Sequence, residues 1–172
     1  MKKEIENKFP QLGGIVPYEA MSQEELLAIK RDLGISLPDD YRAFLQEYGA
    51  AEFGELVQFR PIEGEAGPLS HFYGSMTGNQ SLAKHIKTYT GRMPETMIPI
   101  ADDGGGNQIC LGIKGKEQGK VYYWDHHHEW DEEDYLEEHG KPMPPEVKFQ
   151  NVHLIAESFE DFIQRLEKSQ KA

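Results

Sequence analysis

Two short stretches of this sequence hold residue types that could do chemistry. Residues 102–107 read DDGGGN, so three glycines lie between two aspartates and an asparagine. Residues 125–129 read DHHHE, with three consecutive histidines between two carboxylates. A glycine-rich turn can cradle a phosphate with its backbone amides, and imidazole and carboxylate groups are common ligands of zinc. The elements on either side decide whether either stretch can do so.

A phosphate loop needs a strand before it, a helix after it and usually a lysine at the start of that helix. Residues 96–101 (TMIPIA) read as a strand, but residues 108–113 (QICLGI) are also rich in strand formers and carry no helix signal. Glycine tolerates the positive φ that tight turns require. We therefore expect Gly104–Gly106 to join two antiparallel strands, with at least one glycine at positive φ.

The histidine run does not make a complete metal site. Consecutive residues of an extended chain point to opposite faces, so His126, His127 and His128 cannot all reach one ion from a strand. Zinc needs three or four converging ligands with supporting partners. His126 and His128 could supply part of such a set with Asp125 or Glu129. The pattern favours solvated histidines in an acidic loop, and we predict no metal ion or other cofactor.

No catalytic constellation is evident either. Cys110 lies inside an apolar strand, where a thiol usually behaves as a small buried hydrophobe rather than a reactive thiolate. No serine has the surroundings of a nucleophile elbow, and carboxylate pairs are too numerous here to be specific. We predict that the chain is not an enzyme.

The third feature is an acidic run from Asp125 to Glu138 that contains no Lys or Arg. Eight carboxylates at this density repel one another and cannot be buried unpaired, so the segment must lie on the surface. Trp130, Tyr135 and Leu136 offer it an apolar footing. The carboxylates are Asp125, Glu129, Asp131, Glu132, Glu133, Asp134, Glu137 and Glu138.

The whole chain is acidic, with 30 Asp and Glu against 18 Lys and Arg and a net charge of −12. This balance argues against binding to nucleic acid or to an anionic membrane, which both need a positive surface. It permits a basic protein partner, whose approach such a field accelerates, although acidity also serves to keep a protein in solution.

Localisation follows from what the sequence lacks. No apolar run approaches the roughly 20 residues that span a bilayer, and the first 14 residues have no apolar core of the kind found in a secretory signal. The single cysteine, Cys110, can form no internal disulfide, which agrees with a reducing compartment. We expect a cytoplasmic protein.

A length of 172 residues fits one domain. Apolar periodicity and turn residues predict helices at 22–34, 38–49, 81–91 and 158–166, and one or two acidic helical turns at 132–139. Strands are predicted at 53–62, 96–101, 108–113, 120–124 and 149–155, with a loop at 63–78. The close spacing of the middle strands indicates an antiparallel meander.

Several side chains carry specific expectations. Ser22 with Glu25 has the form of a capping box, and Pro38 suits the first position of the second helix. Leu27 is expected beside the apolar face of the first helix, and Leu166 on that of the last. The expected core rings are Tyr41, Phe44, Trp124, Phe159 and Phe162.

Three segments together resemble one known family. LGISLPDDYRAFLQEYGAAEF, MIPIADDGGGNQICLGIKGKEQGKVYYWDHHHE and IAESFEDFIQRL are similar to the SUKH superfamily (SMI/KNR-type domains), in the branch that includes fungal cell-wall assembly regulators. The resemblance covers roughly residues 22–166 of a single domain at 1–172. The family turn commonly reads Gly-Asp where this chain has Gly106 and Asn107, and the acidic insert at about 130–145 looks long for the family.

The resemblance implies an α+β fold, with a mostly antiparallel sheet flanked by helices, and a binding role without catalysis. Bacterial members are commonly immunity proteins that neutralise a polymorphic toxin made by the same cell, often a nuclease. A basic toxin would suit the acidity of this chain. The fungal relatives supply the alternative, a regulatory scaffold. The oligomeric state stays open.

The acidic segment is the predicted site for the toxin, with Trp130 and Tyr135 as aromatic anchors, because aromatic residues are favoured at energetic hot spots. A solvated, mobile loop is the alternative reading of the same charge run. The predicted partner-binding residues are Asp125, Glu129, Trp130, Asp131, Glu132, Glu133, Asp134 and Tyr135.

Overall fold

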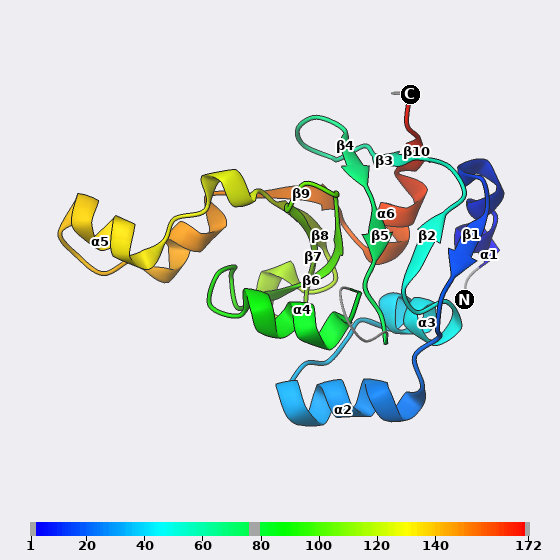
Figure 1. Cartoon of the computed structure of the whole chain (residues 1–172), viewed down its shortest axis with the longest axis horizontal. Coiled ribbons are helices and arrows are strands. Elements are labelled where there is room, and N and C mark those ends of the chain that lie inside the picture. The colour runs from blue at the N-terminus through cyan, green and yellow to red at the C-terminus, as the bar shows by residue number, and fades with distance from the viewer. Residues whose placement is uncertain (1–2, 76–79, 171–172) are drawn as a thin grey trace.

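A computed structural model describes residues 3–75 and 80–170, and it has the predicted α+β class with antiparallel sheets (Figure 1). The helices are α1 (Lys3–Glu6), α2 (Gln23–Leu33), α3 (Asp39–Glu47), α4 (Leu82–Tyr89), α5 (Glu132–His139) and α6 (Phe159–Gln164). Short 3-10 helices are η1 (Phe9–Leu12), η2 (Gly115–Glu117), η3 (His126–His128) and η4 (Pro145–Phe149). The strands are β1 (Ile15–Pro17), β2 (Ala51–Phe53), β3 (Val57–Phe59), β4 (Gly67–Leu69), β5 (His71–Phe72), β6 (Met97–Asp102), β7 (Gln108–Gly112), β8 (Val121–Trp124), β9 (Val152–Ala156) and β10 (Leu166–Lys168).

The central sheet has the order β5-β6-β7-β8-β9, and each neighbouring pair is antiparallel. The predicted meander is therefore confirmed, and the glycine-rich turn joins β6 to β7. Smaller sheets have the orders β1-β2 and β10-β3-β4. Figure 1 places α5 at one end of the long axis of the molecule and the N-terminal elements at the other.

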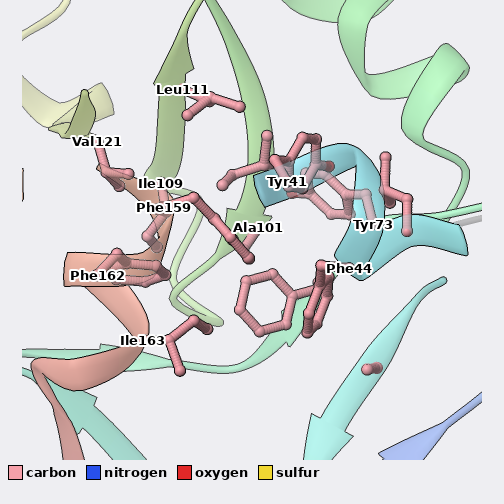
Figure 2. Packing of buried hydrophobic residues seen from close by; sticks show 14 of the residues in the cluster. Tyr41, Phe44, Tyr73, Ala101, Ile109, Leu111, Val121, Phe159, Phe162 and Ile163 are labelled. Atoms are coloured by element: carbon pink, nitrogen blue, oxygen red, sulfur yellow. The ribbon is translucent and has the colours of Figure 1, made fainter. Parts of the chain in front are cut away.

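The two faces of the central sheet bury different side chains, as strand alternation requires. Ile109, Leu111 and Val121 belong to the main core, whereas Cys110 and Trp124 form a smaller cluster with two methionines. Figure 2 shows α3 and α6 contributing rings to the main core. All five predicted core rings are fully buried.

The capping box predicted at the start of α2 is confirmed. The Ser22 hydroxyl accepts from the Glu25 amide at 3.2 Å, and the Glu25 carboxylate accepts from the Ser22 amide at 2.8 Å. Gly34 ends α2 with a φ of 69°. Ser158 caps α6 by accepting from the Asp161 amide at 2.9 Å. These bonds satisfy amide groups that a helix start leaves free.

The predicted strand at 53–62 is wrong, because the chain breaks it into β2 and β3, which belong to different sheets. Gly54 packs so closely on Gly13 that a Cβ atom would lie 2.2 Å from the Gly13 carbonyl oxygen. This backbone contact turns the chain at residue 54. The predicted loop at 63–78 contains β4, which pairs with the preceding strand β3, and β5, which pairs with the distant strand β6. Residues 76–79 of this predicted loop lie outside the described part.

Smaller expectations also change. Pro38 precedes α3 as its cap residue instead of starting the helix. Leu27 is 54% exposed, because the residue that follows the buried Leu26 points to a different side of the helix. Leu166 begins β10 rather than ending the last helix, and Phe149 belongs to η4 rather than to the last predicted strand.

The N-terminal segment, for which the sequence predicted no element, enters the main core. Its buried residues Ile5, Phe9 and Leu12 come from α1 and η1. The Gln164 amide group donates to the Glu4 carbonyl oxygen at 2.8 Å and so joins α6 to α1. The main core therefore draws on chain that precedes residue 22.

Candidate functional site

The acidic run forms part of an arm that leaves the central sheet at the end of β8 and returns at the start of β9. We call residues 125–151 the acidic arm; it contains η3, α5 and η4. Figure 1 shows α5 well separated from the sheets, with the base of the arm beside β8 and β9. The carboxylates are therefore displayed away from the body of the protein.

The glycine turn lies at the base of this arm and is held by its own aspartates. The Asp103 carboxylate accepts from the Gly105 amide at 2.8 Å, from the Asn107 side chain at 2.7 Å and from the Tyr123 hydroxyl at 3.0 Å. Gly104 donates its amide to the Asp102 carboxylate at 2.8 Å. Backbone amides that could have met a phosphate thus bind carboxylates of the same turn. The predicted strand-to-strand role is confirmed.

Positive φ is confirmed at two of the three glycines. Gly104 has a φ of 82° and Gly106 a φ of 95°. A Cβ atom on Gly106 would lie 2.9 Å from the Nε2 atom of His126, whereas one on Gly104 would meet nothing closer than 3.8 Å. Gly106 is therefore needed both for its backbone conformation and for the close approach of the arm.

Asn107 connects the turn to the arm. It is buried, its amide nitrogen donates to Asp103 and its amide oxygen accepts from the His126 backbone amide at 3.0 Å. The His126 ring adds a contact of 2.9 Å between Nε2 and the Gly105 carbonyl oxygen. An aspartate at 107 could not donate to Asp103 and would repel it. This explains why an amide suits this chain where the resembled family commonly has a carboxylate.

The three histidines lie in the 3-10 turn η3 at the start of the arm. Asp125 caps this turn: its carboxylate accepts from the His127 amide at 2.9 Å and lies 2.7 Å from Nδ1 of His128. Partial burial opposes ionisation, but these bonds prevail and lower the pKa of the Asp125 carboxyl group. Within residues 3–75 and 80–170, no group of three or more His, Cys, Asp or Glu is placed to hold a metal ion.

Charged contacts fasten the other side of the arm base to the turn that follows α4. Arg92 binds the Glu129 carboxylate through two nitrogen atoms, at 3.0 and 2.9 Å. Its guanidinium also lies over the rings of Tyr89 and Trp124, at 4.8 and 5.5 Å from their centroids. Lys148 donates to a backbone carbonyl of the same turn at 2.6 Å. Paired, planar contacts of this kind hold a fixed geometry better than a single surface ion pair.

Helix α5 is organised by a cap and a ring cluster. The Asp131 carboxylate accepts from the Glu133 and Asp134 amides at 2.8 and 3.3 Å. Tyr135 is only 7% exposed, stacks on His139 with centroids 4.0 Å apart and meets Trp130 edge-on at 5.5 Å. Acidic residues in the first turn favour the helix through its macrodipole. The rings thus give the arm a small apolar centre of its own.

The predicted site residues therefore divide into two groups. Asp125, Glu129, Asp131 and Tyr135 are occupied by contacts within the arm or at its base. Trp130 is half-buried and supports Tyr135. Glu132, Glu133 and Asp134 are exposed; Glu132 lies 3.5 Å from Lys148.

Two further carboxylates complete the exposed face of α5. Glu137 and Glu138 lie one helical turn after Glu133 and Asp134, so the four share a surface. All four are exposed and, within the described part of the chain, make no ion pair. The predicted site omitted Glu137 and Glu138, although the i, i+4 spacing within the acidic run could have placed them there. Leu136, 48% exposed, adds an apolar side chain to this helix.

Cys110 is placed as the sequence predicted. Its side chain is fully buried, and burial raises the pKa of the thiol far above its ordinary value. Among the described residues, no helix is long and apolar enough to cross a bilayer.

Comparison with known proteins identifies the family. The model of the SMI1/KNR4 family (SUKH-1) matches residues 20–165. The chain is also similar to the SPbeta prophage-derived uncharacterized protein YokK of Bacillus subtilis (strain 168), with 31% identity over 159 residues that cover 83% of this chain and 72% of that protein. The chain therefore belongs to the SMI1/KNR4 (SUKH-1) family.

Proposed function

We propose that the chain is a non-catalytic immunity protein that binds and neutralises a basic toxin protein made by the same cell. Family membership and a relative described as prophage-derived support this role, because bacterial members of the SUKH superfamily commonly have it. The neutralising step is the formation of a complex that covers the toxin.

The observation that carries the proposal is the exposed acidic face of α5. Four carboxylates without ion pairs in the described structure project from a helix that stands clear of the sheets (Figure 1). A field of this sign accelerates the approach of a basic protein. Because the arm is fastened at its base and packed around Tyr135, little conformational freedom remains to be lost when a partner binds.

Within this proposal the predicted residues take different parts. Glu132, Glu133 and Asp134 meet the partner, with Leu136 as an apolar contact beside them. Trp130 and Tyr135 act from inside the arm by holding α5 in position. Asp125 and Glu129 hold the arm to the sheet and to Arg92.

The test compares two variants that each remove two charges and keep side-chain shape. E133Q/E137Q neutralises the arm, and E19Q/E24Q neutralises exposed glutamates outside it. Stopped-flow association is measured with the product of the neighbouring toxin reading frame at two salt concentrations. We expect the arm variant to associate about three- to tenfold more slowly at low salt, with a smaller difference at high salt.

The control variant should change the association rate less than about twofold, because distant exposed charges are screened. If both variants associate equally fast, the arm does not steer the toxin. If the chain forms no complex with the neighbouring product and leaves its toxicity unchanged, the immunity proposal itself fails.

A further inference from the structure

A groove of about 440 Å³ lies between the loop that joins β3 to β4 and the strands β8 and β9. Aromatic and aliphatic groups from Phe59, Tyr123 and Ile155 line it, and the two rings lie 5.8 Å apart between centroids. Phe59 and Ile155 are buried at its floor, so the half-buried Tyr123 supplies most of the ring surface of this depression.

The charged residues that line the groove are all acidic. They are Glu63, Glu65 and Asp125, and neither Lys nor Arg lines it. Glu63 and Glu65 are exposed and make no ion pair within the described residues. Hydrogen bonds from η3 keep Asp125 ionised. The groove thus combines the uncompensated charge of Glu63 and Glu65 with aromatic surface, while Asp125 is already bonded within η3.

We propose that the groove receives an arginine side chain of the same basic partner, an inference that rests on the proposed function. A guanidinium is planar and can stack on a ring while its N–H groups bind carboxylates. An acidic side chain would be repelled by the groove carboxylates. A purely apolar side chain would remove water from them without offering a partner. Lysine could pair with the carboxylates, but it lacks the planar fork that stacks on a ring and binds carboxylates at the same time.

The position of the groove also fits the arm. Asp125 lines the groove and at the same time caps the turn that begins the arm. The groove therefore borders the base of the arm. The arm would supply long-range attraction, and the groove would hold one specific side chain.

The first test needs no toxin. N-acetyl-arginine amide is titrated into the full chain while backbone amide resonances are followed by NMR, with N-acetyl-citrulline amide as an uncharged analogue of the same shape. We expect saturable shifts at Gly64, Tyr123 and His153 with the arginine compound and none with citrulline. E63Q/E65Q should weaken arginine binding by about threefold or more. Each exposed ion pair contributes only a fraction of a kcal/mol, but this variant removes two of them.

E19Q/E24Q removes the same charge elsewhere and should leave arginine binding unchanged. Equal shifts with citrulline, shifts confined to α5, or no effect of E63Q/E65Q would overturn the assignment of the groove. In complex with the toxin, E63Q/E65Q should speed dissociation more than it slows association. If E63Q/E65Q leaves dissociation unchanged while E133Q/E137Q still slows association, the groove assignment is refuted and the immunity proposal stands.

Discussion

At the scale of single residues, the base of the arm depends on one amide side chain. Asn107 donates to Asp103 and accepts from the His126 backbone. A side chain that could only donate or only accept would not join these two segments. A residue in this position affects the arm although it lies in the turn between β6 and β7. Its role follows from hydrogen-bond polarity and burial together.

Replacing Asn107 tests this role directly. Asn107→Asp should lower the free energy of unfolding by about 1–3 kcal/mol, because a buried carboxylate would face Asp103 without a donor between them. Urea unfolding monitored by circular dichroism measures the loss. The swapped double variant D103N/N107D restores one amide and one carboxylate and should recover part of it. Equal losses in the single and double variants would contradict the pairing.

The two glycines at positive φ provide a matched pair. Gly104→Ala and Gly106→Ala should each cost about 1–3 kcal/mol in backbone strain. Gly106→Ala should cost more and should also shift the NMR signals of the His126 ring, because its Cβ atom would lie 2.9 Å from that ring. Chemical denaturation gives the two costs, and identical values with an unmoved His126 ring would show that the close approach is unimportant.

At the scale of elements, the arm behaves as a unit with its own small apolar centre. Trp130, Tyr135 and His139 contact one another, and α5 stands apart from the sheets (Figure 1). An element with few contacts to the main core can open locally without global unfolding. The arm should therefore respond to its own substitutions more than to those in the body.

Trp130→Ala is expected to loosen α5 while the sheets stay folded. Loss of the ring removes two of the three contacts in the cluster, so amide hydrogens at residues 132–139 should exchange at least about tenfold faster. Hydrogen exchange with mass spectrometry measures this. Leu136→Ala, in the same helix but at an exposed side chain, is the control and should change exchange little. A large fall in the melting temperature of the whole protein after Trp130→Ala would mean that the arm is coupled to the core.

The start of the arm should also weaken in acid. The folded-state pKa of Asp125 lies below its ordinary value of 3.8, so its bonds to η3 stabilise the fold above that pH and are lost as the pH falls through the lowered value. We expect the protection of the His127 amide, relative to the unfolded exchange rate at the same pH, to fall as the pH drops through this lowered value, since a protonated carboxyl group is a weaker acceptor. Asp125→Ala, which has no side-chain acceptor, should leave the His127 amide with low protection at all pH values; a wild-type pH profile in this variant would assign the effect to another group.

At the scale of the whole molecule, two separate clusters hold opposite faces of the central sheet. The main core joins α3 and α6 to the sheet (Figure 2), and the smaller cluster around Trp124 supports Arg92 and, through it, Glu129. The body of the protein is therefore stabilised independently of the arm that it presents. A binding surface can then vary in charge without loss of the fold.

Phe162→Ala and Trp124→Ala should each lower the free energy of unfolding by about 3–5 kcal/mol, as expected for large buried rings. Only Trp124→Ala should also disturb the Arg92–Glu129 pair, so its arm should exchange faster in the folded state. Denaturant unfolding with hydrogen exchange separates these effects. Leu27→Ala, at a 54% exposed position, should cost less than about 0.5 kcal/mol. A melting temperature unchanged by either ring substitution would contradict the core assignment.

The sequence by itself determined the features whose causes lie within a few residues. The capping box of Ser22 and Glu25, the glycine turn at 104–106 and the meander of closely spaced strands around that turn depend on local backbone conformation and neighbouring hydrogen bonds. The surface position of the acidic run follows in the same way, because unpaired carboxylates cannot be buried.

Only the tertiary structure decided what depends on contacts between distant residues. The predicted strand at 53–62 is interrupted at Gly54, which lies against Gly13, and β5 forms because the distant strand β6 offers it a partner. The choice of exposed carboxylates on the arm is of the same kind: Glu129 is taken by Arg92, while Glu133 is left to solvent. Periodicity records which face of an element is apolar, but it does not record which remote group will meet that face, since pairing is set by the packing of the whole chain.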